Sequence, residues 1–370
     1  DRVHAVPPSG IRRFFDIAAT MSDVISLGVG EPDFDTPPHI IEAAVASLRA
    51  GRTHYTSNLG TIELRRAIAA KIQERSGVSY DPESEIIVTV GASEAVDLAV
   101  RGTIGAGDRI VLPEPSYVAY LPAVVFAGGT VVPVATSASD NWRLHAEAVD
   151  AAAVGAKALF LGYPANPTGA TLDEPTREAL AKIAVARDLV VISDEIYDRL
   201  VYEGPAHRAM SAYPGMRERT ILIGGFSKSY AMTGWRVGFL CAPKEIVAGL
   251  VKIHQYAIMS APTIAQDAAL EALTNGEPAL EEMRESGEPE QLDHLLKPMD
   301  IAVADRMAVE LSETVAAYFQ LGQEVMSGEA FRNGQEGDIV RVFREGGAFL
   351  GVATVTEDGR IAPKRLVVET

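Results

Sequence analysis

The sequence predicts an α/β fold in which a mostly parallel seven-stranded sheet is covered by helices and followed by a small β-rich C-terminal module. Seven short runs rich in Val, Ile and Leu alternate with segments of helical periodicity between residues 85 and 243. Such runs are typical of strands that are buried on both faces of a parallel sheet. After about residue 290 short strand-like runs are separated by Gly-bearing turns, which indicates a module of a different kind.

The elements of the large sheet follow one another in a regular order. The predicted strands span residues 85–90, 109–115, 130–135, 157–164, 189–195, 220–228 and 237–243. The predicted helices between them span 93–104, 117–128 and 177–188. Sheets of this type bind ligands at the carboxyl ends of their strands, and polar residues stand at these ends here.

The predicted domains differ in composition and in predicted secondary structure. We expect an N-terminal arm with part of a small domain over 1–40, and a large domain over 41–275. The acidic, Gly- and Pro-bearing segment 276–290 indicates a linker or a frayed helix. The module over 291–370 is expected to contain a helix over 311–323 and strands over 338–343, 348–355 and 360–369.

Composition excludes several classes of protein. The 370 residues carry a formal net charge of −17, which disfavours wholesale binding of nucleic acid. Cys241 is the single cysteine, so no disulfide forms within the chain and a cytoplasmic location is expected. No apolar run approaches the ~18 residues of a membrane span, and the first residues do not read as a signal peptide.

The stretch Phe226–Arg236 suggests covalent chemistry. Lys228 follows an apolar strand, and a lysine in such a confined place can lose its proton and attack a carbonyl to form a Schiff base. Ser227 and Arg236 are suited to binding a phosphate. The alternative for Lys228 is an ordinary solvated surface lysine.

A second candidate lies in the stretch Ile192–Leu200. Asp194 ends an otherwise apolar strand, which favours a carboxylate that is paired or bound to a ligand. The alternative role for Asp194 is an N-cap, because the following residues resemble the start of a helix. Tyr197 is close enough in sequence to join the same site.

Two turns after strands provide further polar groups. Asn166 can donate a hydrogen bond to a ligand oxygen, or can simply form a Pro/Gly turn. The turn Gly91–Ser93 opens a helix, so its N–H groups, including those of Ala92 and Ser93, can bind a phosphate. Ser93 as an ordinary N-cap is the alternative.

Two aromatic residues and one Gly-containing turn complete the candidates. Tyr117 follows a strand and can stack on a cofactor ring, although aromatic residues more often pack in a core. Tyr55 has the same two interpretations. The stretch 28–37 contains Gly30, and its glycines permit the backbone to approach a ligand closely.

Together these motifs resemble one family. From Val6 to about Glu285 the chain resembles class I/II aminotransferases of fold type I, which depend on pyridoxal 5'-phosphate. The matching motifs are GVGEPDFDTP, HYTSNLGTIELR, VTVGASEA, EPSYVAY, YPANPTGA, ISDEIYDRL and GGFSKSYAMTGWRVGF. The resemblance implies an enzyme that moves an amino group between an L-amino acid and a 2-oxo acid, needs no metal, and acts as a homodimer.

The resemblance also implies roles around the cofactor ring. Lys228 would hold the cofactor as a Schiff base and move protons at the substrate α-carbon. Asp194 would keep the pyridinium nitrogen protonated. Asn166 and Tyr197 would hydrogen-bond the phenolic oxygen, and Tyr117 would stack on the ring.

Other roles implied by the resemblance concern the phosphate and the substrate. The expected phosphate ligands are Ala92, Ser93, Ser227 and Arg236, with Tyr55 reaching the cofactor of the partner subunit. Gly30 and Asn166 would line the substrate-carboxylate region. Gly225 stands where the family often has Ser or Thr, which would remove one phosphate contact.

The C-terminal part resembles a different family. Residues 291–370 are similar to the C-terminal region of bacterial tRNA pseudouridine synthases, through LDHLLKPMDIAVAD, VELSETVAAYFQLGQEV and DIVRVFREGGAFLGVATVTEDGRIAPKRLVVE. The catalytic domain of that family is not in this sequence. Arg341 either replaces the aminotransferase arginine that grips the substrate carboxylate or is a polar strand residue of the module, the interpretation that we favour.

Two other functions remain open at this point. The same fold supports β-elimination and decarboxylation, so a pyridoxal-phosphate lyase is one alternative. The other is a cofactor-binding but catalytically impaired fusion, whose C-terminal module binds RNA or protein.

Overall fold

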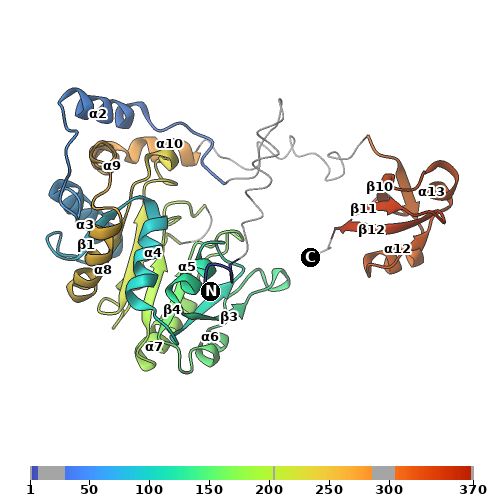
Figure 1. Cartoon of the computed structure of the whole chain (residues 1–370), viewed down its shortest axis with the longest axis horizontal. Helices are drawn as coiled ribbons and strands as arrows, with labels where there is room; N and C mark the ends of the chain where they lie inside the picture. The colour runs from blue at the N-terminus through green and yellow to red at the C-terminus, as the bar shows by residue number, and fades with distance from the viewer. Residues whose placement is uncertain (1, 7–29, 203–204, 286–304, 368–370) are drawn as a thin grey trace. The chain divides into compact units, whose positions relative to one another are not determined.

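The computed structural model describes residues 2–6, 30–202, 205–285 and 305–367 (Figure 1). The chain forms two compact units, Asp1–Gly287 and Glu288–Thr370, and each is described by itself. Much of the predicted arm over 1–40 and the end of the predicted linker lie outside the described residues. No helix in the described ranges has the length and apolar character needed to cross a bilayer.

The first unit is built on a seven-stranded sheet, as predicted. The strands are β1 Ile86–Thr89, β2 Arg109–Glu114, β3 Thr130–Ala135, β4 Ala158–Gly162, β5 Val190–Asp194, β6 Thr220–Gly225 and β7 Gly238–Cys241. Their order across the sheet is β1-β7-β6-β5-β4-β2-β3. The neighbours from β3 to β6 are parallel, whereas β7 runs antiparallel to both β6 and β1. The prediction of a mostly parallel sheet is therefore confirmed, and the reversed β7 is its exception.

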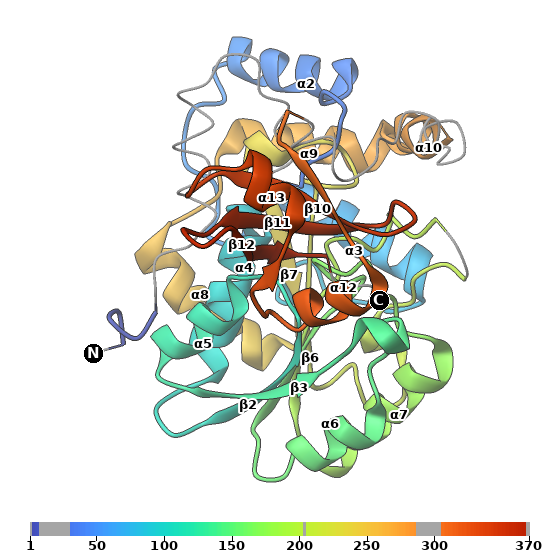
Figure 2. The ribbon, with the colours of Figure 1, turned by 90° about the vertical axis from the view of Figure 1, so that its right-hand side faces the viewer.

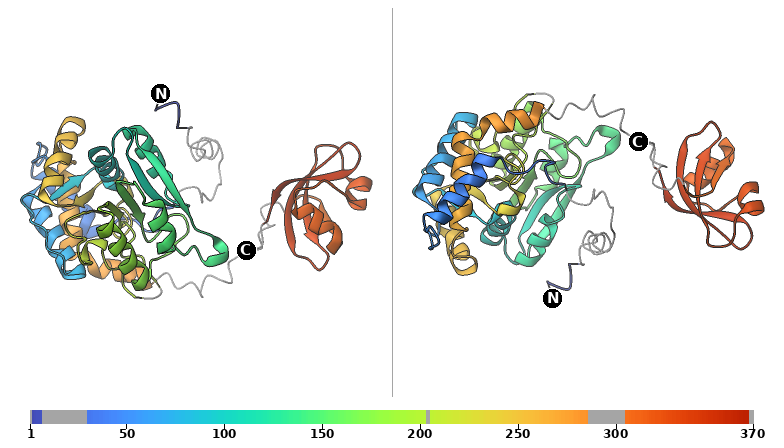
Figure 3. Two further views of the ribbon diagram at one scale, coloured as in Figure 1. Left: turned by 90° about the horizontal axis from the view of Figure 1, so that it is seen from below. Right: turned by 90° about the horizontal axis from the view of Figure 1, so that it is seen from above.

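Helices cover both faces of this sheet (Figure 2; Figure 3). Successive residues of a strand point to opposite faces, and here the side chains on both faces are apolar. On β4, for example, Phe160 packs with one core cluster while Leu159 and Leu161 pack with another. The first cluster contains residues of α4 Gly91–Thr103, α5 Tyr120–Ala127 and α8 Lys244–Ala257. Opposite it lie clusters from α6 Ala146–Ala152 and α7 Glu174–Ala186, and from α3 Ile62–Ser76 and α9 Thr263–Asn275.

Two further helices complete the first unit. Helix α2 Pro38–Arg49 buries Ile40 and Ala44 and packs along α9. Helix α10 Glu277–Glu285 occupies most of the segment 276–290, for which the sequence indicated a linker or a frayed helix. The buried Leu280 and the ion pairs of Glu277 with Arg75 and Arg199, both 2.6 Å, hold this helix on the first unit.

The second unit has its own sheet and its own core. Strands β8 Ala308–Leu311, β9 Val325–Met326, β10 Ile339–Arg344, β11 Phe349–Val355 and β12 Arg360–Leu366 form a sheet in the order β8-β10-β11-β12-β9. Helices α12 Glu313–Gln320 and α13 Gly328–Asn333 accompany it. The β-rich module, its predicted helix and its three predicted strands are confirmed, but β8 and β9 are not among the predicted strands. Both are edge strands, of four and two residues, and β9 is too short to give an alternating pattern.

Candidate active site

A cavity of about 710 Å³ lies where β2, β4, β5 and β6 end in the first unit. Ten of the twelve predicted site residues line it, and Tyr55 and Arg341 do not. The ten are Gly30, Ala92, Ser93, Tyr117, Asn166, Asp194, Tyr197, Ser227, Lys228 and Arg236. They come together because the carboxyl ends of parallel strands meet at one edge of a sheet.

Asp194 is the buried acid of the cavity. It is the last residue of β5, is only 5% exposed, and is followed by turns, so it does not cap a helix. Its Oδ2 accepts a hydrogen bond from the Tyr120 hydroxyl at 2.9 Å, and its Oδ1 accepts one from the Ile196 N–H at 3.2 Å. Burial raises the pKa of Asp194 to about 6, and these two hydrogen bonds oppose the shift. A cationic ligand group beside Asp194 would offset the cost of burying its charge.

Tyr120 fixes the orientation of this carboxylate. Its ring packs against Phe160, with 4.1 Å between centroids, and lies edge-on to Tyr117 at 5.5 Å. Gly162, at the end of β4, makes room for it, because a Cβ there would stand 2.7 Å from the Tyr120 hydroxyl oxygen. Burial holds the pKa of Tyr120 well above its usual value, so its hydroxyl remains a donor to Asp194.

Asn166 and Tyr197 form a polar pair on the next wall of the cavity. The Asn166 side-chain amide donates to the Tyr197 hydroxyl at 3.4 Å. Asn166 follows β4 and Tyr197 follows β5, and these two strands are parallel neighbours. Burial raises the pKa of Tyr197, so its hydroxyl is protonated at neutral pH. Both side chains can therefore donate to an anionic oxygen of a ligand.

Lys228 lies in the turn after β6 and reaches the same space. Its Nζ donates a hydrogen bond to the Gly30 carbonyl and lies 5.7 Å from the centroid of the Tyr197 ring. Burial lowers the pKa of Lys228, the charge of Arg236 acts in the same direction, and the charge of Glu31 opposes them. Lys228 is half-buried and lines the cavity.

The part of the cavity at the start of α4 is suited to an anion. The first residues of α4, including Ala92 and Ser93, line it and present the N–H groups of the first helical turn. Val90, not Ser93, is the N-cap of this helix. Arg236 lies against Gly91, where a Cβ would stand 2.5 Å from a guanidinium nitrogen and φ is +72°. Glycine at this position lets the helix start and the guanidinium face one ligand group.

Two predicted site residues lie elsewhere, and Gly225 is the departure from the family pattern noted in the sequence. Tyr55 is 80% exposed and lies outside the cavity, on the surface of the first unit. Arg341 belongs to β10 of the second unit, where its Nε donates to the Arg306 carbonyl at 3.0 Å. At Gly225 a Cβ would meet the Ile196 side chain at 2.8 Å, so a larger residue would need this neighbour to move.

Comparisons with known proteins identify the family. Residues 22–299 match the family model described as aminotransferase class I and II. The chain belongs to this aminotransferase family. The chain is 46% identical over 287 residues to a putative aminotransferase, YugH, of Bacillus subtilis, a match that covers 77% of this chain and 74% of the relative. An aspartate aminotransferase of Pyrococcus abyssi is 45% identical with the same coverage.

A solved structure and a second family model add to this assignment. The chain superposes on aspartate aminotransferase from Thermus thermophilus with maleate at a TM-score of 0.73 and 39% identity, covering 77% of this aminotransferase and 75% of that chain. Residues 308–367 match a different model, described as pseudouridine synthase II TruB, C-terminal. The aminotransferase assignment thus concerns the first unit, and members of this family use pyridoxal phosphate.

The cavity of this aminotransferase fits that cofactor. A buried carboxylate, a pair of neutral donors, a lysine of lowered pKa and a helix start with a guanidinium surround one space. These groups match a pyridinium nitrogen, a phenolic oxygen, an aldehyde and a phosphate respectively.

Nine lining residues were not among the predicted site residues, and three of them, Tyr120, Glu31 and Thr233, form side-chain hydrogen bonds described here. Tyr120 lies three positions after Tyr117, the spacing that places two side chains on one face of a helical turn, and this was the available signal. Glu31 and Thr233 hydrogen-bond to each other at 3.1 Å across 202 positions of sequence. Sequence patterns of local range contain no signal for that pair.

Proposed function

We propose that this aminotransferase transfers an amino group between an L-amino acid and a 2-oxo acid, with Lys228 as the residue that binds pyridoxal phosphate covalently. The observation that carries the proposal is the convergence of Lys228, Asp194 and Asn166 on one cavity. When bound, pyridoxal phosphate supplies an aldehyde that condenses with amines and a ring that accepts the electron pair left at the substrate α-carbon.

Lys228 has two tasks in this proposal. It anchors the cofactor until a substrate amine displaces it, and its free Nζ then takes the proton from the α-carbon of the amino acid. Its lowered pKa favours the neutral amine that this step requires. The same amino group later returns a proton, so it serves as base and acid in turn.

The remaining residues bind and orient. Asp194 pairs with the protonated ring nitrogen, and Asn166 and Tyr197 donate to the phenolic oxygen. The ring of Tyr117 stacks on the cofactor. The phosphate is held at the start of α4 and by a second group of side chains; these ligands are Ala92, Ser93, Ser227 and Arg236. Gly30 and Asn166 border the substrate carboxylate.

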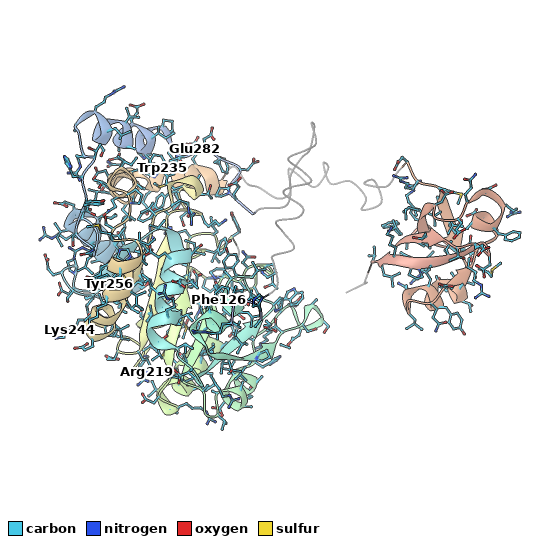
Figure 4. All side chains as sticks on the ribbon, in the orientation of Figure 1. Phe126, Arg219, Trp235, Lys244, Tyr256 and Glu282 are labelled. Carbon is cyan, nitrogen blue, oxygen red and sulfur yellow. The ribbon has the colours of Figure 1, made fainter. Side chains whose placement is uncertain are left out.

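We also propose a homodimer in the cytoplasm as the active form. Tyr55 and Tyr256 are 80% and 87% exposed, and Tyr256 lies on the outer side of α8 (Figure 4). Segments 54–58 and 259–263 are joined by hydrogen bonds from Thr263 Oγ1 to the His54 carbonyl (2.7 Å) and from Asn58 Nδ2 to the Met259 carbonyl (2.8 Å). Such an exposed aromatic surface supports self-association, with Tyr55 reaching the partner's cofactor. The domain limits near residues 40, 275 and 290 remain part of this proposal.

A visible absorbance spectrum with added pyridoxal phosphate tests the proposed function. We expect a band that depends on Lys228, and its conversion to the pyridoxamine form when L-aspartate, L-alanine or L-glutamate is added. Lys228→Ala removes the band, whereas Lys244→Ala, at an exposed lysine labelled in Figure 4, leaves it unchanged. A band of equal strength in Lys228→Ala would overturn the assignment.

One observation favours a second role for the C-terminal unit. This unit has its own buried core, which includes Val309, Phe319 and Val342, and it matches a family model of its own. We infer that it is a binding module for RNA or protein. A gel-shift assay with tRNA at moderate salt tests the RNA arm, and the absence of a shift leaves protein as the partner.

A further inference from the structure

A segment far from Lys228 in sequence is hydrogen-bonded to the turn that contains Lys228. We call residues 30–36 the strap. The Lys228 Nζ donates to the Gly30 carbonyl, and Thr36 Oγ1 donates to the Ala231 carbonyl at 2.6 Å. The Trp235 indole N–H donates to Thr36 Oγ1 at 2.9 Å. The strap is therefore tied to both sides of the turn that presents the lysine amine.

Glu31 is the charged residue of the strap that faces the site. Its Oε2 accepts a hydrogen bond from Thr233 Oγ1 at 3.1 Å. Glu31, Gly30, Tyr197 and Lys228 line both the 710 Å³ cavity and a neighbouring cavity of about 380 Å³. The Glu31 carboxylate thus stands at the boundary between the two spaces, beside the lysine.

We propose that Glu31 is a positioning residue, whose carboxylate orients the free amine of Lys228 and stabilises its ammonium form after it has taken the α-proton. This inference rests on the proposed function, because it concerns the step in which Lys228 is free. The C–H bond at the substrate α-carbon breaks and its proton passes to Lys228 Nζ, while the bound cofactor would accept the electron pair left at that carbon. Glu31 does not itself accept the proton.

The charges around Lys228 support a role for Glu31 in stabilising the ammonium form of this lysine. Burial and Arg236 disfavour the ammonium form, and Glu31 opposes them. The other ionisable side chains that line the two cavities are Asp33, Asp194, Tyr117, Tyr120, Tyr197 and Tyr202. Of these carboxylates, Asp194 lines only the first cavity and Asp33 only the second, whereas Glu31 lines both beside Lys228.

Three variants separate charge from structure. Glu31→Gln removes the charge, and Glu31→Asp keeps it. Asp33→Asn is the matched control, because Asp33 lines the neighbouring cavity from the same strap but is not at the boundary. The first readout uses the protein without cofactor: the pH dependence of Lys228 acylation by acetic anhydride, followed by mass spectrometry.

We expect Glu31→Gln to lower the Lys228 pKa, since an opposite charge favours the charged form. In the loaded enzyme we expect kcat to fall about 10-fold with KM changed less than twofold, and the α-deuterium isotope effect to increase. Glu31→Asp should recover most of both properties, and Asp33→Asn should behave as wild type.

The outcomes distinguish this inference from the proposed function. If wild type forms no Lys228-dependent band, the proposed function fails. If wild type forms the band but Glu31→Gln matches Asp33→Asn in Lys228 pKa and kcat, the inference is overturned. If Glu31→Gln does not fold, Thr233→Val removes the anchor of Glu31 while keeping its charge. A lower kcat with unchanged cofactor affinity then supports the inference, and wild-type kcat overturns it.

Discussion

The two units of this aminotransferase use their sheets differently. In the first unit, polar side chains that follow β4, β5 and β6 converge on one cavity. In the second unit, the inward-facing residues of the sheet are apolar and form a closed core. Its central strands β10, β11 and β12 are antiparallel neighbours joined by short turns.

The difference follows from strand direction. Parallel strands all end at the same edge, so residues from several loops meet there. Antiparallel neighbours end at opposite edges, which distributes their polar turns over both ends of the sheet. We therefore expect the cofactor chemistry to depend on the first unit, and the following variants test that expectation from the largest effect to the smallest.

Asp194→Asn should have the largest effect. The variant cannot hold a protonated ring nitrogen by charge, so we expect kcat to fall at least about 10³-fold. Steady-state kinetics with saturating cofactor measures this, with Asp33→Asn as the control. A loss below 10-fold would contradict the role of Asp194.

Asp194→Asn should also change how the free energy of unfolding depends on pH. Because burial raises the pKa of Asp194 to about 6, the folded protein without cofactor binds this proton more tightly than the unfolded chain does. Its free energy of unfolding therefore falls as pH rises from about 4 to 6, and the loss persists above pH 6. Asp194→Asn avoids this loss, so its stability relative to wild type should rise by about 3 kcal/mol between pH 4 and pH 7 in urea denaturation.

Tyr120→Phe should have a smaller effect on the same group. Loss of the hydroxyl removes a hydrogen bond that lowers the pKa of Asp194, so that pKa should rise above about 6. We expect kcat to fall about 10-fold, equivalent to one hydrogen bond to a charged group. Tyr213→Phe is the control, because it removes a hydroxyl bound to Glu174 outside the cavity. Equal effects of the two variants would argue against a role for Tyr120.

Glu277→Gln should act on the candidate active site from outside the cavity. Its ion pair with Arg199 ties α10 to the loop that carries Tyr197. Because Glu277 is partly exposed, we expect a loss of only about 1 kcal/mol in stability and a two- to threefold weaker cofactor affinity. Fluorescence titration with the cofactor measures the latter. Glu282→Gln, on the same helix (Figure 4), should leave both unchanged.

Arg341→Ala should have the smallest effect. Arg341 hydrogen-bonds a carbonyl of its own unit, so we expect an unchanged cofactor band and a KM for the amino acid within twofold of wild type. A KM raised more than 10-fold would assign Arg341 to the substrate carboxylate.

The sequence predicted the elements of the site better than their contacts. Strand positions and the residues after them follow from local apolar patterns, and ten of the predicted residues line one cavity. The role of Tyr120 was not predicted, because its partner Asp194 lies 74 positions away. The prediction for Arg341 placed a strand residue correctly but left its role open, since that role depends on contacts beyond its own strand.

The sequence by itself determined the sheet strands, the covering helices and the residue types of the site, since these depend on periodicity and side-chain chemistry along short stretches. Only the tertiary structure decided that β7 runs antiparallel, because strand direction depends on packing after β6 and not on the composition of the strand. It also decided that Glu31 meets Thr233 beside Lys228. Contacts between residues some 200 positions apart exist only once the chain has folded, and they complete the site.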